Sequence, residues 1–273
     1  MPDLDTAAPF LAVDGVSLSF GGTHALRDVT LRVERGRITG LIGPNGAGKT
    51  SLLNCICGYY RPTSGTIGFE GAVLTSWSTA RIAAQGIGRT FQTPQLSHGL
   101  DVLQNVMLGL HRYTDVGLLA ATIPWRRGAR AEREARRQAV EVLDLLGIGD
   151  QAPRSVGELS FAQQKVVEIA RAVATRPELL LLDEPGSGMS AEEKRHVSRL
   201  VGRLRDELGI TPVIIEHDIG FIRELCDVVV VLDFGAVLTE GPAAEVLADP
   251  RVVAAYVGSQ PDETAPRPSI ATS

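Results

Sequence analysis

The 273-residue chain has few cysteines, no excess of positive charge and no long apolar run. Each of these absences argues against a class of protein. Its three cysteines, Cys55, Cys57 and Cys226, show neither metal-type spacing nor the even count of a disulfide framework, which indicates a reducing compartment. A formal net charge of -5 argues against nucleic acid as the main partner, because such proteins usually carry a basic surface.

Membrane-spanning and secretory segments are also missing. No stretch reaches the run of about 18 apolar residues that a spanning helix needs, because the best candidate, Val106 to Ile123, contains Arg112 and Asp115. Residues 1–9 have no apolar centre and do not read as a secretory signal. We expect residues 1–9 and 259–273 to be disordered tails, and any membrane association to come through a partner.

The most informative stretch is GPNGAGKTS, which fits the phosphate-binding pattern G-x-x-x-x-G-K-[ST]. An apolar run, Ile38 to Ile42, precedes it, and a mostly apolar or small stretch, Ser51 to Cys57, follows it. The glycines let backbone N–H groups turn inward around a polyphosphate, the lysine adds positive charge, and the threonine hydroxyl is placed for a magnesium ion. The nucleotide-binding residues predicted here are Gly43, Pro44, Asn45, Gly46, Ala47, Gly48, Lys49, Thr50 and Ser51.

Two adjacent carboxylates follow a second apolar run, LLLLDEP. Asp183, at the end of the predicted strand, is placed to bind magnesium through its water shell. Glu184, beside it, is placed to polarise a water for in-line attack on the terminal phosphate. Together with the phosphate loop, these residues predict magnesium-dependent nucleotide hydrolysis.

A capped helix is predicted shortly before these carboxylates. In LSFAQQ, Ser160 and Gln163 form an S-x-x-Q capping box, and the apolar residues Val166, Ile169 and Val173 of the next stretch fall on one helical face. The N–H groups at such a helix start favour an anion, so this is a candidate second phosphate site.

The pattern of strands and helices predicts an α/β fold. Alternating apolar and polar residues predict a small antiparallel sheet with strands at Phe10 to Phe20, Ala25 to Val33, Thr66 to Phe69 and Ala72 to Leu74. Continuous apolar runs predict buried strands of a parallel sheet, flanked by helices, at Glu178 to Leu182, Val213 to Glu216 and Val228 to Leu232.

These motifs, in this order, resemble the nucleotide-binding subunits of ABC transporters from about residue 10 to residue 258. The resemblance implies a P-loop NTPase with a RecA-like parallel core, an antiparallel β subdomain and a helical subdomain at about 92–176. It also implies that ATP binds with Mg2+ between two subunits, and that the signature residues of one subunit face the ATP of the other. Those signature residues are Ser160, Phe161, Ala162 and Gln163.

The same resemblance assigns roles to single residues. Phe20 matches the aromatic residue that stacks on adenine, and residues 187–190 match the loop that crosses the dimer interface. The implied catalytic residues are Glu184, His217 and Gln92, and the implied magnesium ligands are Thr50, Gln92 and Asp183.

Within the family, the chain resembles the ATP-binding subunits of branched-chain amino-acid importers. The resemblance rests on RTFQTPQL, on the long stretch between Gln92 and the signature, and on the ending Tyr256 to Gly258. It implies a position at the cytoplasmic face of the membrane, with integral-membrane permease subunits, a second ATP-binding subunit and an extracytoplasmic solute-binding protein as partners. Lipopolysaccharide-export ATPases are a close alternative, although that group generally lacks the insertion around His111 to Gly128.

Two residues depart from the family pattern. Ala162 stands where the group usually has glycine, so closure of the dimer on the phosphates is expected to be weaker or shifted. Ser190 stands where the group usually has Asn or Asp. Ala162 also motivates an alternative function, a nucleotide-gated regulatory dimer with little turnover.

The segment RRGARAEREARR carries six arginines against two glutamates. It fits either contact with acidic lipid headgroups or a membrane subunit, or a solvated helix face on which Glu132 pairs with Arg136.

Overall fold

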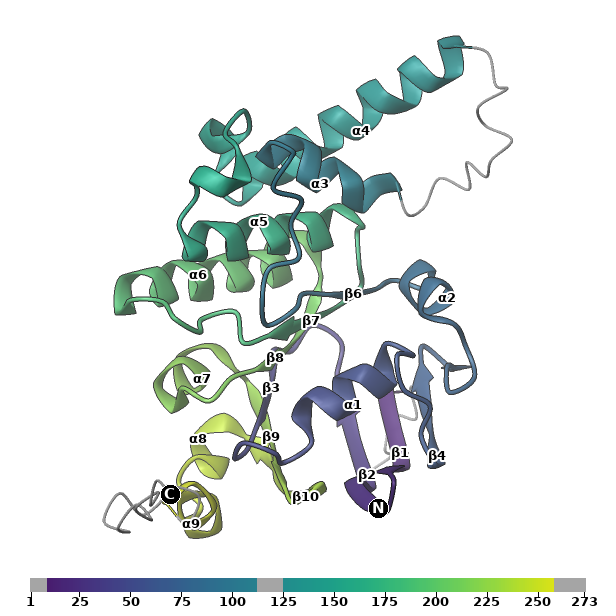
Figure 1. Cartoon of the computed structure of the whole chain (residues 1–273). Helices are drawn as coiled ribbons and strands as arrows, with labels where there is room; N and C mark the ends of the chain where they lie inside the picture. The colour runs from purple at the N-terminus through teal and green to yellow at the C-terminus, as the bar shows by residue number, and fades with distance from the viewer. Residues whose placement is uncertain (1–8, 112–124, 258–273) are drawn as a thin grey trace, which may run out of the picture.

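The computed structural model describes residues 9–111 and 125–257, which form two β-sheets with helices packed around them (Figure 1). The predicted tails, apart from residue 9, lie outside the described residues. The centre of the insertion, residues 112–124, also lies outside them.

The first sheet is antiparallel, with the strand order β2-β1-β4-β5. Its strands are β1 (Leu11–Phe20), β2 (Thr23–Val33), β4 (Ser64–Phe69) and β5 (Ala72–Val73). Gly21 and Gly22, both with positive φ, make the turn between β1 and β2. Apolar and polar residues alternate along these strands because only one face of the sheet is buried. The predicted antiparallel subdomain is confirmed.

The second sheet has the order β10-β9-β3-β8-β7-β6 and is parallel except for the pair of β9 and β10. Its strands are β3 (Thr39–Ile42), β6 (Ile87–Arg89), β7 (Leu179–Asp183), β8 (Thr211–Ile215), β9 (Val228–Asp233) and β10 (Ala236–Pro242). The strands β3, β7, β8 and β9 confirm the predicted parallel core. The edge strands β6 and β10 were not predicted, because one is very short and the other lacks a continuous apolar run.

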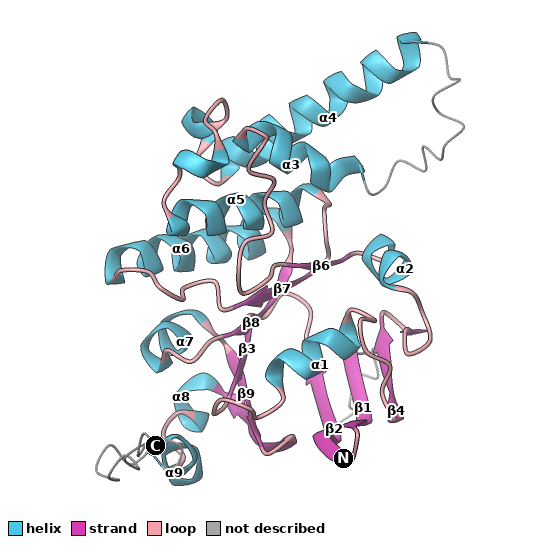
Figure 2. Ribbon diagram, in the orientation of Figure 1, coloured by secondary structure: helices cyan, strands magenta, loops and turns pink. Residues whose placement is uncertain are grey.

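Helices cover both faces of the six-stranded sheet (Figure 2). The helices of the described ranges are α1 (Lys49–Ile56), α2 (Thr79–Ala84), α3 (Val102–His111), α4 (Trp125–Leu145), α5 (Phe161–Ala174), α6 (Ala191–Leu208), α7 (Ile219–Leu225), α8 (Ala243–Val246) and α9 (Pro250–Val257). Single 3-10 turns lie at Gly149–Gln151 and Val156–Glu158. Within the described ranges, no helix is long and apolar enough to cross a membrane.

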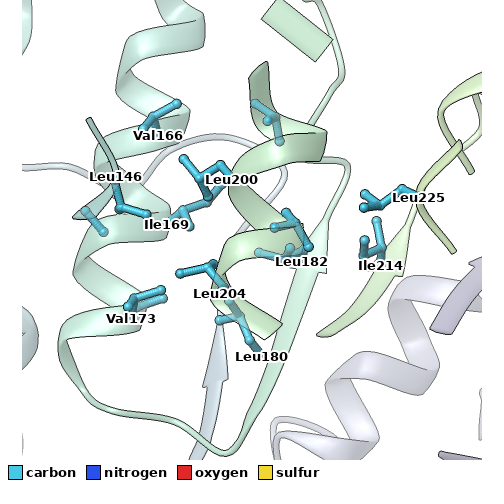
Figure 3. Packing of buried hydrophobic residues seen from close by; sticks show 14 of the residues in the cluster. Leu146, Val166, Ile169, Val173, Leu180, Leu182, Leu200, Leu204, Ile214 and Leu225 are labelled. Carbon is cyan, nitrogen blue, oxygen red and sulfur yellow. The ribbon is translucent and has the colours of Figure 1, made fainter. Parts of the chain in front are cut away.

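The side chains of the parallel strands alternate between two hydrophobic cores. Leu180 and Leu182 of β7 belong to the core formed with α5 and α6, part of which is drawn in Figure 3. Leu179 and Leu181 of the same strand belong to the core shared with α1 and the antiparallel sheet. The sheet therefore separates a phosphate-loop side, which carries α1, from a signature side, which carries α5.

The helices α3, α4 and α5 pack against one another at one end of the molecule (Figure 1). The expectation that Glu132 pairs with Arg136 is wrong, because these two residues form no ion pair among the described side chains of α4. Arg137 instead binds both Glu134 and Glu141 on an exposed face. Its position three residues after one glutamate and four before the other gives it two partners, whereas Arg136 has only Glu132 at such a spacing.

Candidate functional site

The predicted phosphate loop lies between β3 and α1 and is shaped by its glycines. Gly43 has φ 147°, and a Cβ there would approach the Leu232 carbonyl oxygen to 2.0 Å. Gly48 has φ 102°, and a Cβ there would lie 2.6 Å from the Ala25 carbonyl oxygen. Only glycine fits at these two positions, because both the backbone angle and the space exclude a side chain. Gly48 also begins α1 and supplies no side-chain cap, so the N–H groups of the first turn have no capping side chain.

Lys49 is buried inside this loop. Its Nζ donates hydrogen bonds to the carbonyl oxygens of Gly43 and Pro44, at 2.7 and 2.9 Å. Burial lowers the pKa of Lys49, while the nearby carboxylates of Glu184 and Asp183 oppose that shift. The ammonium group therefore lies close both to the loop carbonyls and to the carboxylates of the predicted base, Glu184, and of the predicted magnesium ligand, Asp183.

Asp183 ends β7, and its carboxylate is buried in an ion pair. Arg89, at the end of β6, donates from Nη2 to Oδ2 of Asp183 at 3.1 Å and from Nη1 to Oδ1 of Asn54 at 2.6 Å. Burial raises the pKa of Asp183, and Arg89 opposes this shift. The arginine thus offsets part of the cost of burying the carboxylate beside the loop.

Glu184 lies at the centre of the three predicted catalytic residues. Gln92 donates from Nε2 to Oε2 of Glu184 at 3.0 Å, and Nδ1 of His217 lies 3.9 Å from Oε1. Glu184 has φ 50°, an uncommon angle for a residue with a side chain, and its own N–H donates to the Ile215 carbonyl oxygen at 2.9 Å. Residues from three separate segments therefore meet at one carboxylate.

The three predicted magnesium ligands, Thr50, Gln92 and Asp183, line one cavity of about 420 Å³. Their hydroxyl, amide and carboxylate oxygens are the donor type that a hard divalent cation prefers. The residues present therefore fit a magnesium ion that completes its ligands with water and phosphate oxygens.

Phe20 lies at the end of β1 and is 47% exposed. Its ring contacts that of Tyr60 edge to face, with centroids 5.1 Å apart. The neighbouring strand β2 passes Gly48 at Ala25. This leaves an exposed aromatic surface on the hairpin that borders the phosphate loop, as stacking on a base requires.

The predicted signature residues begin α5, on the other side of the sheet. The capping box is confirmed: Gln163 N–H donates to Ser160 Oγ at 3.3 Å, and Ser160 N–H donates to Gln163 Oε1 at 2.9 Å. Phe161 is 45% exposed, and Ala162 packs against the core. In the part of the chain that the structure describes, none of these residues bonds to residues 43–51. One subunit therefore does not assemble both halves of the predicted site.

The predicted interface loop, residues 187–190, ends in a second capping box. Ser190 accepts from Glu193 N–H at 3.3 Å, and Ser190 N–H donates to Glu193 Oε2 at 2.8 Å, at the start of α6. Serine is among the preferred N-cap residues, as are Asn and Asp. The departure from the family pattern at this position therefore keeps a good helix cap.

Sequence reasoning missed three side chains that support the site. Arg89 binds Asp183, Lys165 donates to the Glu184 carbonyl oxygen, and Tyr256 Oη accepts from Gly43 N–H at 2.8 Å. Arg89 lies three residues before Gln92 and Tyr256 lies in the family-like ending, but neither pattern names a contact partner. A lone lysine among the mostly apolar residues of the predicted helix was the available signal for Lys165.

Comparisons with known proteins agree with this geometry. The family model described as ABC transporter matches residues 26–187, and the model described as Branched-chain amino acid ATP-binding cassette transporter matches residues 236–262. The high-affinity branched-chain amino acid transport ATP-binding protein BraF of Pseudomonas aeruginosa is 37% identical over 250 residues, which are 92% of this chain and 98% of BraF.

Two solved structures extend the comparison. The ADP conformation of MJ1267, an ATP-binding cassette of an ABC transporter, has a TM-score of 0.81 and 33% identity, covering 92% of this chain and 99% of its own. The dimeric post-hydrolysis state of the ATP-binding cassette MJ0796 with ADP and Pi has a TM-score of 0.71 and 26% identity, covering 85% and 98%. The chain therefore belongs to the ABC transporter family, as an ATP-binding subunit that hydrolyses ATP.

Proposed function

We propose that this subunit drives the import of branched-chain or other hydrophobic amino acids, working at the cytoplasmic face of the membrane with integral-membrane permease subunits and an extracytoplasmic solute-binding protein. The similarity to BraF over 98% of that protein and the match to the branched-chain family model support this substrate class. They do not favour the lipopolysaccharide-export alternative or a regulatory dimer. We further propose that the working unit is the domain at 10–258, in a dimer with a similar subunit.

The observation that carries the catalytic part of the proposal is the position of Glu184 between Gln92 and His217, close to Lys49. In the proposed mechanism, the backbone N–H groups of residues 43–51 bind the phosphates and Phe20 stacks on adenine. Lys49 leaves its carbonyl partners for the phosphate oxygens, where its charge stabilises the transition state. Glu184 orients and deprotonates the attacking water, and Gln92 and His217 fix the direction of its carboxylate.

A bound magnesium ion would neutralise charge that develops on the phosphates, with Thr50, Gln92 and Asp183 as the residues that hold it. The side chains of Ser160, Phe161, Ala162 and Gln163 from the second subunit would close the site over the γ-phosphate. Because the two halves lie on different sides of the sheet within one chain, this closure requires the dimer.

The test is Glu184→Gln, which keeps the size of the side chain and removes the base. We expect ATP turnover to fall by at least about 100-fold, while ATP-dependent dimerisation in gel filtration survives. Glu178→Gln is the matched control. Glu178 directly precedes β7, at the end of the strand opposite to Glu184, and its side chain is 45% exposed. Undiminished turnover in Glu184→Gln would contradict the assignment of the base.

The substrate class has a separate test. In vesicles that contain the subunit with its permeases, we expect ATP turnover to rise when a leucine-loaded binding protein is added on the opposite side. Stimulation by lipopolysaccharide instead would overturn the amino-acid assignment and leave the ATPase assignment intact.

A further inference from the structure

Lys165 is a buried cation that the mechanism above does not use. Lys165 lies in the second turn of α5 and is only 3% exposed. Its Nζ donates a hydrogen bond to the backbone carbonyl oxygen of Glu184. The helix that begins with the signature residues is therefore joined directly to the backbone of the catalytic carboxylate.

The bond lies where the backbone is under constraint. Glu184 has φ 50°, a conformation that residues with a side chain seldom adopt, and its N–H is already bound to the Ile215 carbonyl oxygen at 2.9 Å. The carbonyl oxygen of the same residue accepts from Lys165 Nζ, and also from Ser187 N–H at 3.2 Å. These bonds hold the backbone of Glu184 from both sides, and the backbone sets the direction in which the carboxylate projects toward Gln92 and His217.

The surroundings of Lys165 are acidic. Burial lowers the pKa of Lys165, and the carboxylates of Glu216, Glu184, Glu168 and Asp183 oppose that shift. Glu216 is itself buried, and it accepts from Gly186 N–H at 2.6 Å and from His217 N–H at 3.3 Å. A cation at this point therefore faces the loops that carry both Glu184 and His217, and its burial is compensated by charge as well as by the hydrogen bond.

Lys165 also contacts the exposed end of its own helix. Its Nζ lies 5.3 Å from the centre of the Phe161 ring, and that ring lies against Gly188 of the interface loop. Phe161 belongs to the surface that we propose meets the second subunit. Lys165 thus links that surface to the Glu184 carbonyl oxygen through one side chain, beside the route along the backbone of residues 184–188.

We propose that Lys165 is a positioning residue that couples the placement of α5 to the orientation of Glu184, so that closure of the signature side on one ATP affects the base of the chain's own site. This inference rests on the proposed function, because it assumes that Glu184 is the base and that α5 meets a second subunit.

The experiment compares Lys165→Met, which removes the ammonium and keeps an apolar stem, with Lys165→Arg, which keeps a cationic donor. We expect Lys165→Met to lower kcat by at least about tenfold while the Kd for ATP stays within about twofold, because the base and not the phosphate loop is affected. Lys165→Arg should recover most of the lost kcat. If Lys165→Met does not fold, Lys165→Gln retains a polar amide in the buried site and should show the same split.

Two controls separate positioning from general destabilisation. Val173→Ala removes core packing from the same helix away from Glu184, and it should lower the melting temperature without lowering kcat at 25 °C. In the Glu184→Gln background, Lys165→Met should cause no further loss of the residual turnover, because its effect acts through Glu184.

An unchanged kcat in Lys165→Met, or an equal loss with and without Glu184, would overturn the inference. Absence of ATP turnover in the unmodified chain would instead overturn the proposed function, so the two failures are distinguishable.

Discussion

The starts of α1 and α5 face the same ligand in the proposed dimer, yet they are built differently. The helix α1 begins at Gly48, whose backbone is left-handed and which supplies no side-chain cap. The helix α5 begins at Ser160, which forms a complete reciprocal capping box with Gln163. The backbone N–H groups at the start of α1 therefore remain available to phosphate oxygens. At the start of α5, two backbone N–H groups are already bonded to the side chains of Ser160 and Gln163.

This difference indicates a division of labour. The loop before α1 is already shaped for a polyphosphate, so it should bind nucleotide in a single subunit. The start of α5 is stable without a ligand, which lets the signature surface remain folded while the dimer is open. Phosphate can approach that surface only at closure, so α5 should contribute mainly to turnover and α1 mainly to affinity.

The largest effect should come from Lys49→Ala, on the α1 side. Removal of the ammonium deletes charge-assisted bonds worth about 1.5–3 kcal/mol each, so we expect ATP affinity to fall by about 100-fold. Fluorescence titration with a labelled ATP analogue measures this. Arg203→Ala removes an exposed cation paired with Glu207 and should leave the affinity unchanged. Tight binding by Lys49→Ala would break the assignment of affinity to the α1 side.

The matching test of the α5 side is Ser160→Ala. Loss of this cap should lower the free energy of unfolding by about 1 kcal/mol. It should also lower turnover by about tenfold at nearly constant ATP affinity, which corresponds to about 1.4 kcal/mol in the activation barrier. Ser78→Ala removes the N-cap of α2 and serves as the control, since it should cost similar stability without lowering turnover. Equal turnover in the two variants would show that Ser160 only caps its helix.

The sequence alone was sufficient to predict the parts of the site in which pattern and backbone geometry coincide. The phosphate loop, the strand that ends at Asp183 and the capping box at Ser160 each lie within a few consecutive residues. Each of these patterns has a local physical cause: glycine where φ is positive, a continuous apolar run where a strand is buried on both faces, and a serine where a helix begins.

What could not be predicted depends on residues far apart in the chain. Arg89 and Asp183 meet because β6 and β7 pair, and β6 is too short to show a period. Tyr256 reaches Gly43 only after the whole sheet has formed. On α4, Arg137 pairs with Glu134 and Glu141, whereas the equally allowed spacing of Glu132 and Arg136 gives no ion pair among the described side chains. Exposed ion pairs differ by small amounts of free energy, which spacing rules do not resolve.

Ala162→Gly refines the comparison at the α5 end. The methyl group packs against the core of its own subunit, so its removal should lower the free energy of unfolding by about 1 kcal/mol through the lower helix propensity of glycine. Chemical denaturation measures this. Gly202→Ala, within α6 where an added methyl meets nothing within 4 Å, is the reverse control and should raise stability by about 1 kcal/mol. A rise in turnover in Ala162→Gly would show that the methyl obstructs closure on the phosphates.

Tyr256→Phe should have the smallest effect and tests whether the α1 side is shaped by its own sequence alone. Tyr256 Oη accepts from Gly43 N–H, and the carbonyl oxygen of that glycine accepts from Lys49 at 2.7 Å, so α9 supports the residue that positions the phosphate-binding lysine. The substitution keeps the ring and removes about 1 kcal/mol of hydrogen bonding, which should weaken ATP binding by about fivefold. Calorimetric titration with ATP measures the change. Equal affinity in the variant would show that the loop keeps its shape without α9, and the glycines between β3 and α1 would then suffice to build the phosphate site.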